Sequence, residues 1–130
     1  RRKGIENVKL GKFIGVSRSL LPSLVAKRNL NTPLSEEVQA MAERLGQDAY
    51  IRQQQAILGR PDSRPDLAGI KVPTLIGVGT EDVLTPMELA EEMAATVPHA
   101  DIVRFAKSAH LPTMENPKAV ADAFGNWLAR

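Results

Sequence analysis

Two short segments of the sequence place an ionisable side chain directly after a strand-like run. Asp82 stands in residues 79–86 (Gly-Thr-Glu-Asp-Val-Leu-Thr-Pro), and His110 stands in residues 108–111 (Ser-Ala-His-Leu). A carboxylate and an imidazole on two such loops are the acid and the base of a nucleophilic catalytic triad. The carboxylate fixes the tautomer of the imidazole, which leaves the other ring nitrogen to take a proton from a nucleophile. The pattern therefore predicts acid–base catalysis by Asp82 and His110.

Each of these two residues also has an interpretation without catalysis. An aspartate shortly before Thr-Pro is often a turn or capping residue, and a single histidine in a loop is often a surface or packing residue. Glu81 is a second candidate for the acid, although we expect it to point towards solvent, and we expect His99 to be exposed and inert. The pairing of Asp82 with His110 on consecutive loops of one βαβ unit favours catalysis.

The nucleophile is the component that the sequence does not show clearly. A hydrolase of this design needs a serine on a sharp strand-to-helix turn, usually in a Gly-x-Ser-x-Gly motif that precedes the acid. Residues 15–19 (Gly-Val-Ser-Arg-Ser) lack the second glycine, and residues 9–14 before them contain two lysines and a glycine, unlike a buried strand. We therefore expect Ser17 to lie in a helical segment. Ser108 lies too near His110 in the sequence for in-line attack.

The elements that must position the acid and the base form two strand–helix pairs. Residues 74–79 are a short apolar run typical of a buried strand, and residues 101–105 form a second strand. A helix is predicted over 85–97, and Asn116 and Pro117 begin a last helix. This alternation predicts parallel pairing with a right-handed crossover. Two parallel strands leave an open edge and an uncovered flank, so we expect the last third of a sheet whose other strands lie elsewhere.

The start of the helix over 85–97 has the clearest local signal. Thr85 stands at the N-cap position, Pro86 at the first helical position and Glu88 at the third, which together make a capping box. We therefore expect the side chain of Thr85 to cap this helix.

The first part of the sequence has a helical pattern. Residues 32–35 (Thr-Pro-Leu-Ser) begin a helix that Gly46 ends, and a further helix is expected over 48–58. The stretch that follows is rich in turn formers and marks a boundary. The sequence thus predicts two parts: a helical segment over 1–60 and a βαβα unit over 61–130.

Composition narrows the classes of function. The 130 residues carry a net charge of +2, and no basic face is interleaved with aromatic residues, so nucleic acid is not an expected partner. The sequence has no cysteine, which excludes disulfides and thiolate metal sites, and its two histidines are too far apart for a local metal motif. The apolar runs are too short for a membrane span, and no signal peptide is recognisable. We expect a cytoplasmic protein without a membrane partner, a metal or a cofactor.

Taken together, these segments resemble the C-terminal part of an α/β-hydrolase, in the branch of small bacterial esterases and enol-lactonases. The most specific parts are residues 72–86, then Ala109-His110-Leu111, and then residues 114–117 (Met-Glu-Asn-Pro). The resemblance covers nearly the whole chain. Ala109 is a departure, because the family usually has glycine before this histidine.

The resemblance implies a fold, an activity and a division of roles. It assigns the triad acid to Asp82, the base to His110, and a helical cap that overhangs the site to residues 1–60. In the family the other strands, the oxyanion-hole loop and the serine precede the cap, so we expect a fragment that lacks the nucleophile. The implied reaction is hydrolysis of a carboxylic ester or lactone, without a cofactor. Loose candidates for an apolar substrate pocket are Leu45, Tyr50, Ile51 and Leu58.

Two alternatives remain open at this point. The chain could be a non-catalytic assembly module whose open sheet edge pairs with a separate N-terminal half or with a second copy of the chain. The same acid–base pair also serves dehalogenases and carbon–carbon bond hydrolases, in which the nucleophile is aspartate or serine, respectively. The expected partners are a small ester or lactone substrate and the missing N-terminal half or second copy. The fragment alone is expected to be inactive.

Overall fold

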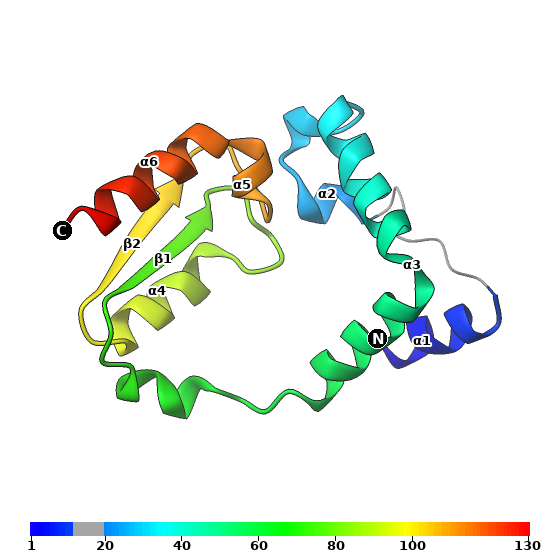
Figure 1. Cartoon of the computed structure of the whole chain (residues 1–130), viewed down its shortest axis with the longest axis horizontal. Helices are drawn as coiled ribbons and strands as arrows, with labels where there is room; N and C mark the ends of the chain where they lie inside the picture. Colours follow the sequence, from blue (N-terminus) through cyan, green and yellow to red (C-terminus); the bar gives the residue numbers. More distant parts are fainter. Residues whose placement is uncertain (12–19) are drawn as a thin grey trace.

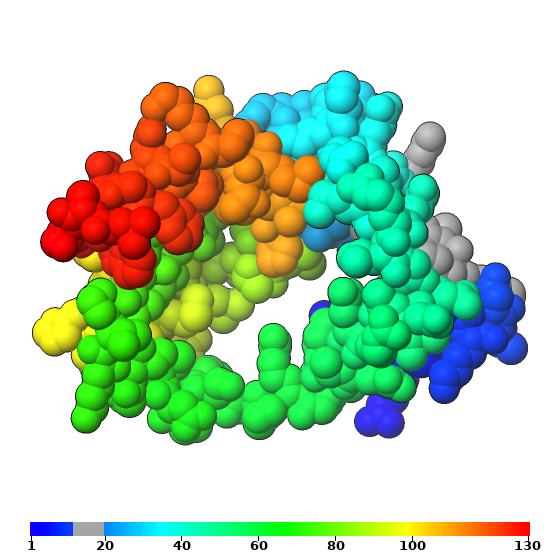
Figure 2. All heavy atoms as spheres, viewed as in Figure 1, coloured from blue at the N-terminus to red at the C-terminus, as the bar shows by residue number. Residues whose placement is uncertain are grey.

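The molecule has a helical part and a part built around a small sheet. A computed structural model describes residues 1–11 and 20–130, so the motif-like segment over 15–19, with Ser17, lies outside the described residues. The helices up to Gly59 form the first part, and the two strands with the helices around them form the second (Figure 1). The surface of the molecule has a hollow between the two parts (Figure 2).

Two parallel strands form the sheet that carries the site loops. β1 (Thr74–Gly79) pairs with β2 (Ala100–Phe105), with Thr74 opposite Ala100 and Gly79 opposite Phe105. Because the strands are parallel and in level register, their carboxyl ends lie side by side at one edge of the sheet. The predicted α/β fold is confirmed; β1 has the predicted bounds, and β2 starts one residue earlier than expected.

Helices cover both faces of this sheet. The crossover helix α4 (Met87–Thr96) packs on one face, and α6 (Pro117–Leu128) lies on the other (Figure 1). Ile76 and Val78 of β1 and Ala90 of α4 form the buried core between strand and helix. Burial of each larger apolar side chain stabilises the fold by roughly 1.5–3 kcal/mol. Within the described residues, no strand pairs with the second edge of β1.

Within the described residues, three short helices and one long helix make up the helical part. α1 (Arg2–Lys9) packs against the long helix α3 (Pro33–Gly59). The one-turn helix α2 (Leu21–Leu24) and the 3₁₀ turn η1 (Lys27–Asn29) lie beside the first turns of α3. The helical pattern predicted for this part is therefore confirmed for the residues that the structure describes.

The long helix α3 has the predicted start and a kink in the middle. The Ser35 hydroxyl accepts a hydrogen bond from the Thr32 N–H at 3.1 Å, and the reciprocal bond completes a capping box. Gly46 has φ 73°, a left-handed conformation that interrupts the helical path and suits glycine. The sequence predicts that the helix ends at Gly46. In the structure Gly46 is instead a kink, and a second helical stretch follows it directly.

The prediction for the start of α4 was wrong. The helix begins at Met87 with Pro86 as its N-cap residue, so Thr85 does not cap it. The physical reason is competition: the N–H and the hydroxyl of Thr85 both donate to the carboxylate of Asp82. Another helix, the single turn α5 (Pro112–Glu115), was not predicted.

A short linking segment joins the two parts of the chain. α3 ends at Gly59, and the 3₁₀ segment η2 (Arg64–Gly69) then leads into β1. The predicted boundary at residue 60 falls in this link, and the role of residues 1–60 as a cap stays a prediction. No helix within the described residues is long and apolar enough to cross a membrane.

Candidate active site

A tight turn after β1 positions Asp82. The N–H of Asp82 donates to the carbonyl oxygen of Gly79 at 3.2 Å, which closes the turn. The N–H of Glu81 donates to the carbonyl oxygen of Ser108 at 2.8 Å. This bond fixes the turn against the loop after β2, which carries His110.

The carboxylate of Asp82 is held by four polar contacts. Its Oδ1 accepts hydrogen bonds from the N–H groups of Leu84 at 2.8 Å and Thr85 at 3.0 Å, and its Oδ2 accepts one from the Thr85 hydroxyl at 2.8 Å. Oδ2 also lies 2.9 Å from Nδ1 of His110, and only 6% of the Asp82 side chain is exposed.

The electrostatics of this site keep Asp82 ionised. Burial acts to raise the pKa of its carboxyl, but the hydrogen bonds from Thr85, His110 and Leu84 outweigh burial and lower the pKa below its ordinary value. An ionised carboxylate only accepts hydrogen bonds, so the proton of this contact belongs to Nδ1 of His110. With the Nδ1 proton held by Asp82, the nitrogen left to accept a proton is Nε2.

His110 is placed so that this second nitrogen can act as a base. Its side chain is 35% exposed, and within the described residues no hydrogen bond to Nε2 is formed. The Thr85 hydroxyl lies 3.2 Å from Nδ1 and supports the same ring edge as Asp82. The pair can therefore serve as a general base with an ionised orienting partner. The structure brings Asp82 and His110 into the expected contact, and their catalytic role stays a prediction.

The other acid–base candidates lie away from this contact. Glu81 has an exposed side chain, as expected, and pairs with Arg28 at 3.5 Å. His99 is exposed in the turn that enters β2, at the opposite end of the strand from His110. Neither residue meets the Asp82–His110 pair.

The described serine nearest to His110 in sequence is not positioned as a nucleophile. Ser108 is fully buried, and its hydroxyl points to the carbonyl oxygen of Ala106 at 3.5 Å. In the parts of the chain that the structure describes, no three His, Asp or Glu side chains gather in a way that could hold a metal ion.

A cavity of about 530 Å³ reaches the acid–base pair. Asp82, Thr85 and His110 lie on its wall, and Leu67, Leu89 and Met93 provide apolar surface. Residues 77–79 of β1 also line it, so the cavity runs along the unpaired edge of this strand.

The pocket residues expected from the sequence do not line this cavity. Its remaining wall residues come from the link before β1, from α4 and from α5: Arg60, Arg64, Ala90, Glu92 and Pro112. Leu45, Tyr50, Ile51 and Leu58 are therefore absent from the wall of this cavity. Their part in a substrate pocket of the intact hydrolase stays a prediction.

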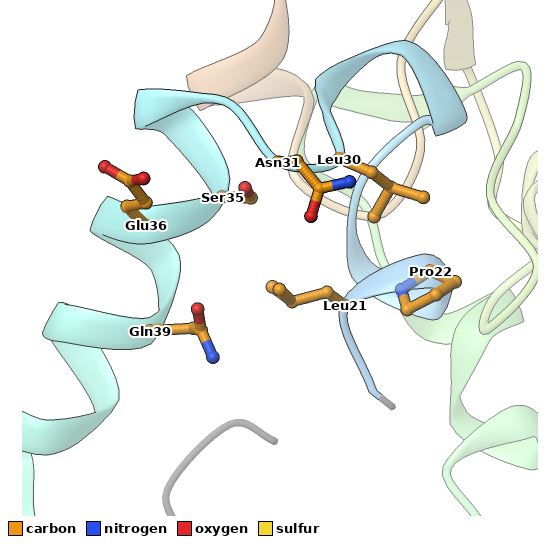
Figure 3. A pocket seen from close by; sticks show the side chains of 7 residues that line it. All are labelled: Leu21, Pro22, Leu30, Asn31, Ser35, Glu36 and Gln39. Atoms are coloured by element: carbon orange, nitrogen blue, oxygen red, sulfur yellow. The ribbon is translucent and has the colours of Figure 1, made fainter. Parts of the chain in front are cut away.

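A second cavity, of about 320 Å³, lies between α2, the residues Leu30 and Asn31, and α3 (Figure 3). Leu21 and Pro22 form one side, and Ser35, Glu36 and Gln39 lie along α3 on the other. Neither Asp82 nor His110 lines this cavity, so it is separate from the acid–base pair.

Two residues make contacts with the site loops that were not predicted from the sequence. Thr85 donates to Asp82 instead of capping α4, and a three-residue spacing from an aspartate to a threonine is a local signal for such a bond. Glu115 accepts a hydrogen bond from the N–H of Ala109, next to His110. Its other two donors, the N–H of Ala26 and Nδ2 of Asn29, are 89 and 86 residues away, so no local pattern predicts them.

Comparison with known sequences places the chain among hydrolases. The family described as alpha/beta hydrolase family matches residues 10–123. The chain is similar to the AB hydrolase superfamily protein YclE of Bacillus subtilis (strain 168), with 39% identity over 70 residues, or 53% of this chain and 25% of the relative. It is also similar to a proline iminopeptidase of Levilactobacillus brevis, with 34% identity over 68 residues, or 52% of this chain and 22% of the relative.

Comparison with solved structures shows the same fold. A thermophilic esterase from Thermogutta terrifontis superposes with a TM-score of 0.91 at 30% identity, over 98% of this chain and 48% of the esterase chain. The enol-lactonase from Burkholderia xenovorans LB400 superposes with a TM-score of 0.81 at 21% identity, over 99% of this chain and 50% of that one. The second likeness shows the fold alone. The chain spans about half the length of these two structures.

Proposed function

Because the chain belongs to the alpha/beta hydrolase family, we propose that it supplies the acid and the base of a serine hydrolase for carboxylic esters or lactones. The observation that carries the proposal is the 2.9 Å contact between Asp82 Oδ2 and His110 Nδ1, made at the carboxyl ends of two neighbouring parallel strands. The likeness to an esterase at 30% identity supports the ester class, and a lactone is a cyclic ester with the same chemistry.

In the proposed reaction His110 moves the proton and Asp82 stays ionised. A serine attacks the ester carbonyl while Nε2 takes its hydroxyl proton; the imidazolium then protonates the leaving oxygen, so the ester C–O bond breaks and an acyl-enzyme remains. Water repeats the cycle: its proton goes to Nε2, its oxygen attacks the acyl carbon, and the serine oxygen leaves with that proton. Asp82 holds the Nδ1–H and balances the charge of the imidazolium.

We propose that the serine and the oxyanion hole come from polypeptide outside these 130 residues. Ser108 is buried with its hydroxyl on the carbonyl oxygen of Ala106, and the chain corresponds to 48% of the esterase structure. The second edge of β1 is unpaired within the described residues, so a further parallel strand can add there. An N-terminal half or a second copy of the chain would supply it. The 130 residues together with that polypeptide are called the complete hydrolase below.

The cavity along β1 would then be divided between the added strand and the substrate. Residues 77–79 line the part at the open strand edge, where the added strand would lie. The end with Asp82 and His110 would be left for a small ester or lactone, and residues 1–60 would form the cap over it. No cofactor takes part in this chemistry.

The unpaired edge of β1 also supports a second candidate, a non-catalytic assembly module. In that case the chain would pair through this edge without contributing to turnover. The size of the chain in solution, measured by light scattering, bears on this alternative, because a well-folded monomer would argue against an edge that needs a partner. A dehalogenase or a carbon–carbon bond hydrolase would be distinguished by the identity of the nucleophile in the complete hydrolase.

Replacement of the base tests the proposal directly. His110→Asn in the complete hydrolase should lower kcat for a p-nitrophenyl ester by about 10⁴-fold or more, because no other described group can take the serine proton. His99→Asn is the matched control: the same change at an exposed histidine whose φ of 59° asparagine tolerates. Equal activity of the two variants would reject the proposed role of His110.

The 130-residue chain alone should not react with a serine-directed fluorophosphonate. This result follows if the nucleophile lies outside the chain. Stoichiometric labelling of Ser17 would contradict the proposal and would identify a nucleophile within the 130 residues.

A further inference from the structure

The carboxylate of Glu115 joins the loop that carries His110 to the helical part of the chain. Its Oε2 accepts a hydrogen bond from the N–H of Ala109 at 2.6 Å. Its Oε1 accepts two more, from the N–H of Ala26 at 2.6 Å and from Nδ2 of Asn29 at 2.8 Å. One partly buried side chain thus binds three donors, one in the loop that carries His110 and two in residues 26–29.

The next peptide of the same loop is also held by the helical part. The N–H of His110 donates to the carbonyl oxygen of Leu24 at 3.1 Å. The N–H groups of Ala109 and His110 therefore both bond to residues outside the loop that carries the imidazole. Ala26 and Ala109, whose N–H groups bond to Glu115, are 2% and 1% exposed.

Apolar packing holds the same two segments together. Leu111, which directly precedes α5, and Met114 within α5 pack against a cluster that includes Leu21 and Val25. Val25 is 1% exposed, so water is excluded beside the Glu115 contacts. In such surroundings an N–H without an acceptor costs about 1–3 kcal/mol, which makes the three bonds to Glu115 hard to replace.

We propose that Glu115 is a positioning residue that sets the orientation of His110 and couples it to residues 24–29 of the proposed cap. The inference rests on the proposed function, because the orientation of the imidazole matters only if His110 is the base. Glu115 acts through the Ala109 peptide and touches neither substrate nor reacting atoms. A displacement of residues 24–29 would therefore move the base away from the nucleophile.

The donor set explains why a carboxylate is needed at position 115. Both carboxylate oxygens must accept a hydrogen bond, because Ala26 and Ala109 offer backbone N–H groups, which can only donate. A glutamine has one oxygen and one NH₂ group, so its NH₂ would face one of these two N–H groups. Glu115→Gln keeps the size of the side chain and breaks one side of the connection.

Kinetics of Glu115→Gln in the complete hydrolase test the proposal. We expect kcat for a p-nitrophenyl ester to fall by about 10- to 100-fold with KM changed less than about threefold, because a small displacement of a catalytic group costs this much. We also expect the ¹H–¹⁵N signals of the His110 ring to change, which a purely structural role of Glu115 would not cause. Glu43→Gln, the same change at an exposed position of α3, should leave both measurements unchanged.

Asn29→Ala provides a second variant if Glu115→Gln does not fold. It keeps the carboxylate and removes one donor from the helical part, so the expected effect has the same direction and is smaller, about two- to fivefold in kcat. Unchanged kcat and unchanged His110 ring signals in a folded Glu115→Gln, or in Asn29→Ala when it is the variant that folds, would overturn the inference.

The outcome for His110→Asn separates this inference from the proposed function. If His110→Asn abolishes turnover and Glu115→Gln has no effect, only the positioning role fails. If His110→Asn retains full turnover, the proposed function itself fails.

Discussion

The backbone of Gly79 lies directly against the carbonyl oxygen of Ala109, so closely that a Cβ atom at position 79 would overlap it. A Cβ atom at position 79 would also overlap the carbonyl oxygen of Ser108. The end of β1 and the loop after β2 are thus in backbone contact at the level of the site. This contact leaves the following residues, Asp82 and His110, within hydrogen-bond distance.

Gly79→Ala should therefore destabilise the fold and separate the site loops. The added methyl group meets backbone atoms that cannot rotate away, and overpacking of this kind costs about 2–3 kcal/mol. Urea unfolding of the chain measures the effect. Gly125→Ala is the control: a Cβ there meets nothing within 4 Å, and alanine in the helix α6 should stabilise by about 0.5–1 kcal/mol. Equal midpoints for the two variants would contradict this account.

Asp82→Asn should lower kcat of the complete hydrolase by about 10³–10⁴-fold. A neutral amide does not balance the imidazolium charge, and its NH₂ group can stabilise the wrong tautomer of His110. Glu81→Gln tests the competing acid, and we expect kcat within about twofold of the parent, because the exposed pair with Arg28 contributes little. The reverse ranking of these two variants would assign the acid to Glu81.

The stability contributed by Asp82 should depend on pH in a defined direction. Its pKa is lowered in the folded chain, whereas in the unfolded chain an aspartate titrates at about 3.9. The contribution is fully present above the unfolded pKa and is lost as the pH falls through the lower, folded pKa. The difference in the free energy of unfolding between the parent and Asp82→Asn should thus be constant near neutral pH and shrink in acid. A difference that persists unchanged at the lowest pH would show that the carboxylate charge does not matter.

Thr85→Val should weaken catalysis without preventing folding. The variant loses the hydroxyl that donates to Asp82 Oδ2 and lies 3.2 Å from His110 Nδ1. A hydrogen bond to a charged acceptor contributes about 1.5 kcal/mol, so kcat should fall by about tenfold. Thr85→Ser keeps the hydroxyl and should retain kcat. The account fails if serine and valine give the same rate.

The parallel sheet and the meeting of its two loops could be predicted from the sequence. Residues 74–79 were recognised because a buried strand is a continuous apolar run, and the order strand–helix–strand implies parallel neighbours. Parallel neighbours end at the same edge of a sheet, which was enough to expect Asp82 and His110 in contact. This expectation needed only the order of elements along the chain.

The hydrogen-bond partners of the side chains around the site were less predictable. The pattern of a capping box is present in Thr85, Pro86 and Glu88. The Thr85 hydroxyl nevertheless donates to the Asp82 carboxylate, and the helix starts at Met87. A local pattern cannot rank two acceptors that compete for one hydroxyl. Their ranking depends on where the turn after β1 places the carboxylate.

The sequence by itself determined the family resemblance, the strands and the expected contact of Asp82 with His110, because these follow from residue types and from their order along the chain. Only the tertiary structure decided what holds that pair in place. The donors that meet Glu115 stand 89, 86 and 6 residues away from it. A hydrogen bond forms only between atoms about 3 Å apart. Which distant atoms reach that distance depends on how α2, α5 and the site loops pack together.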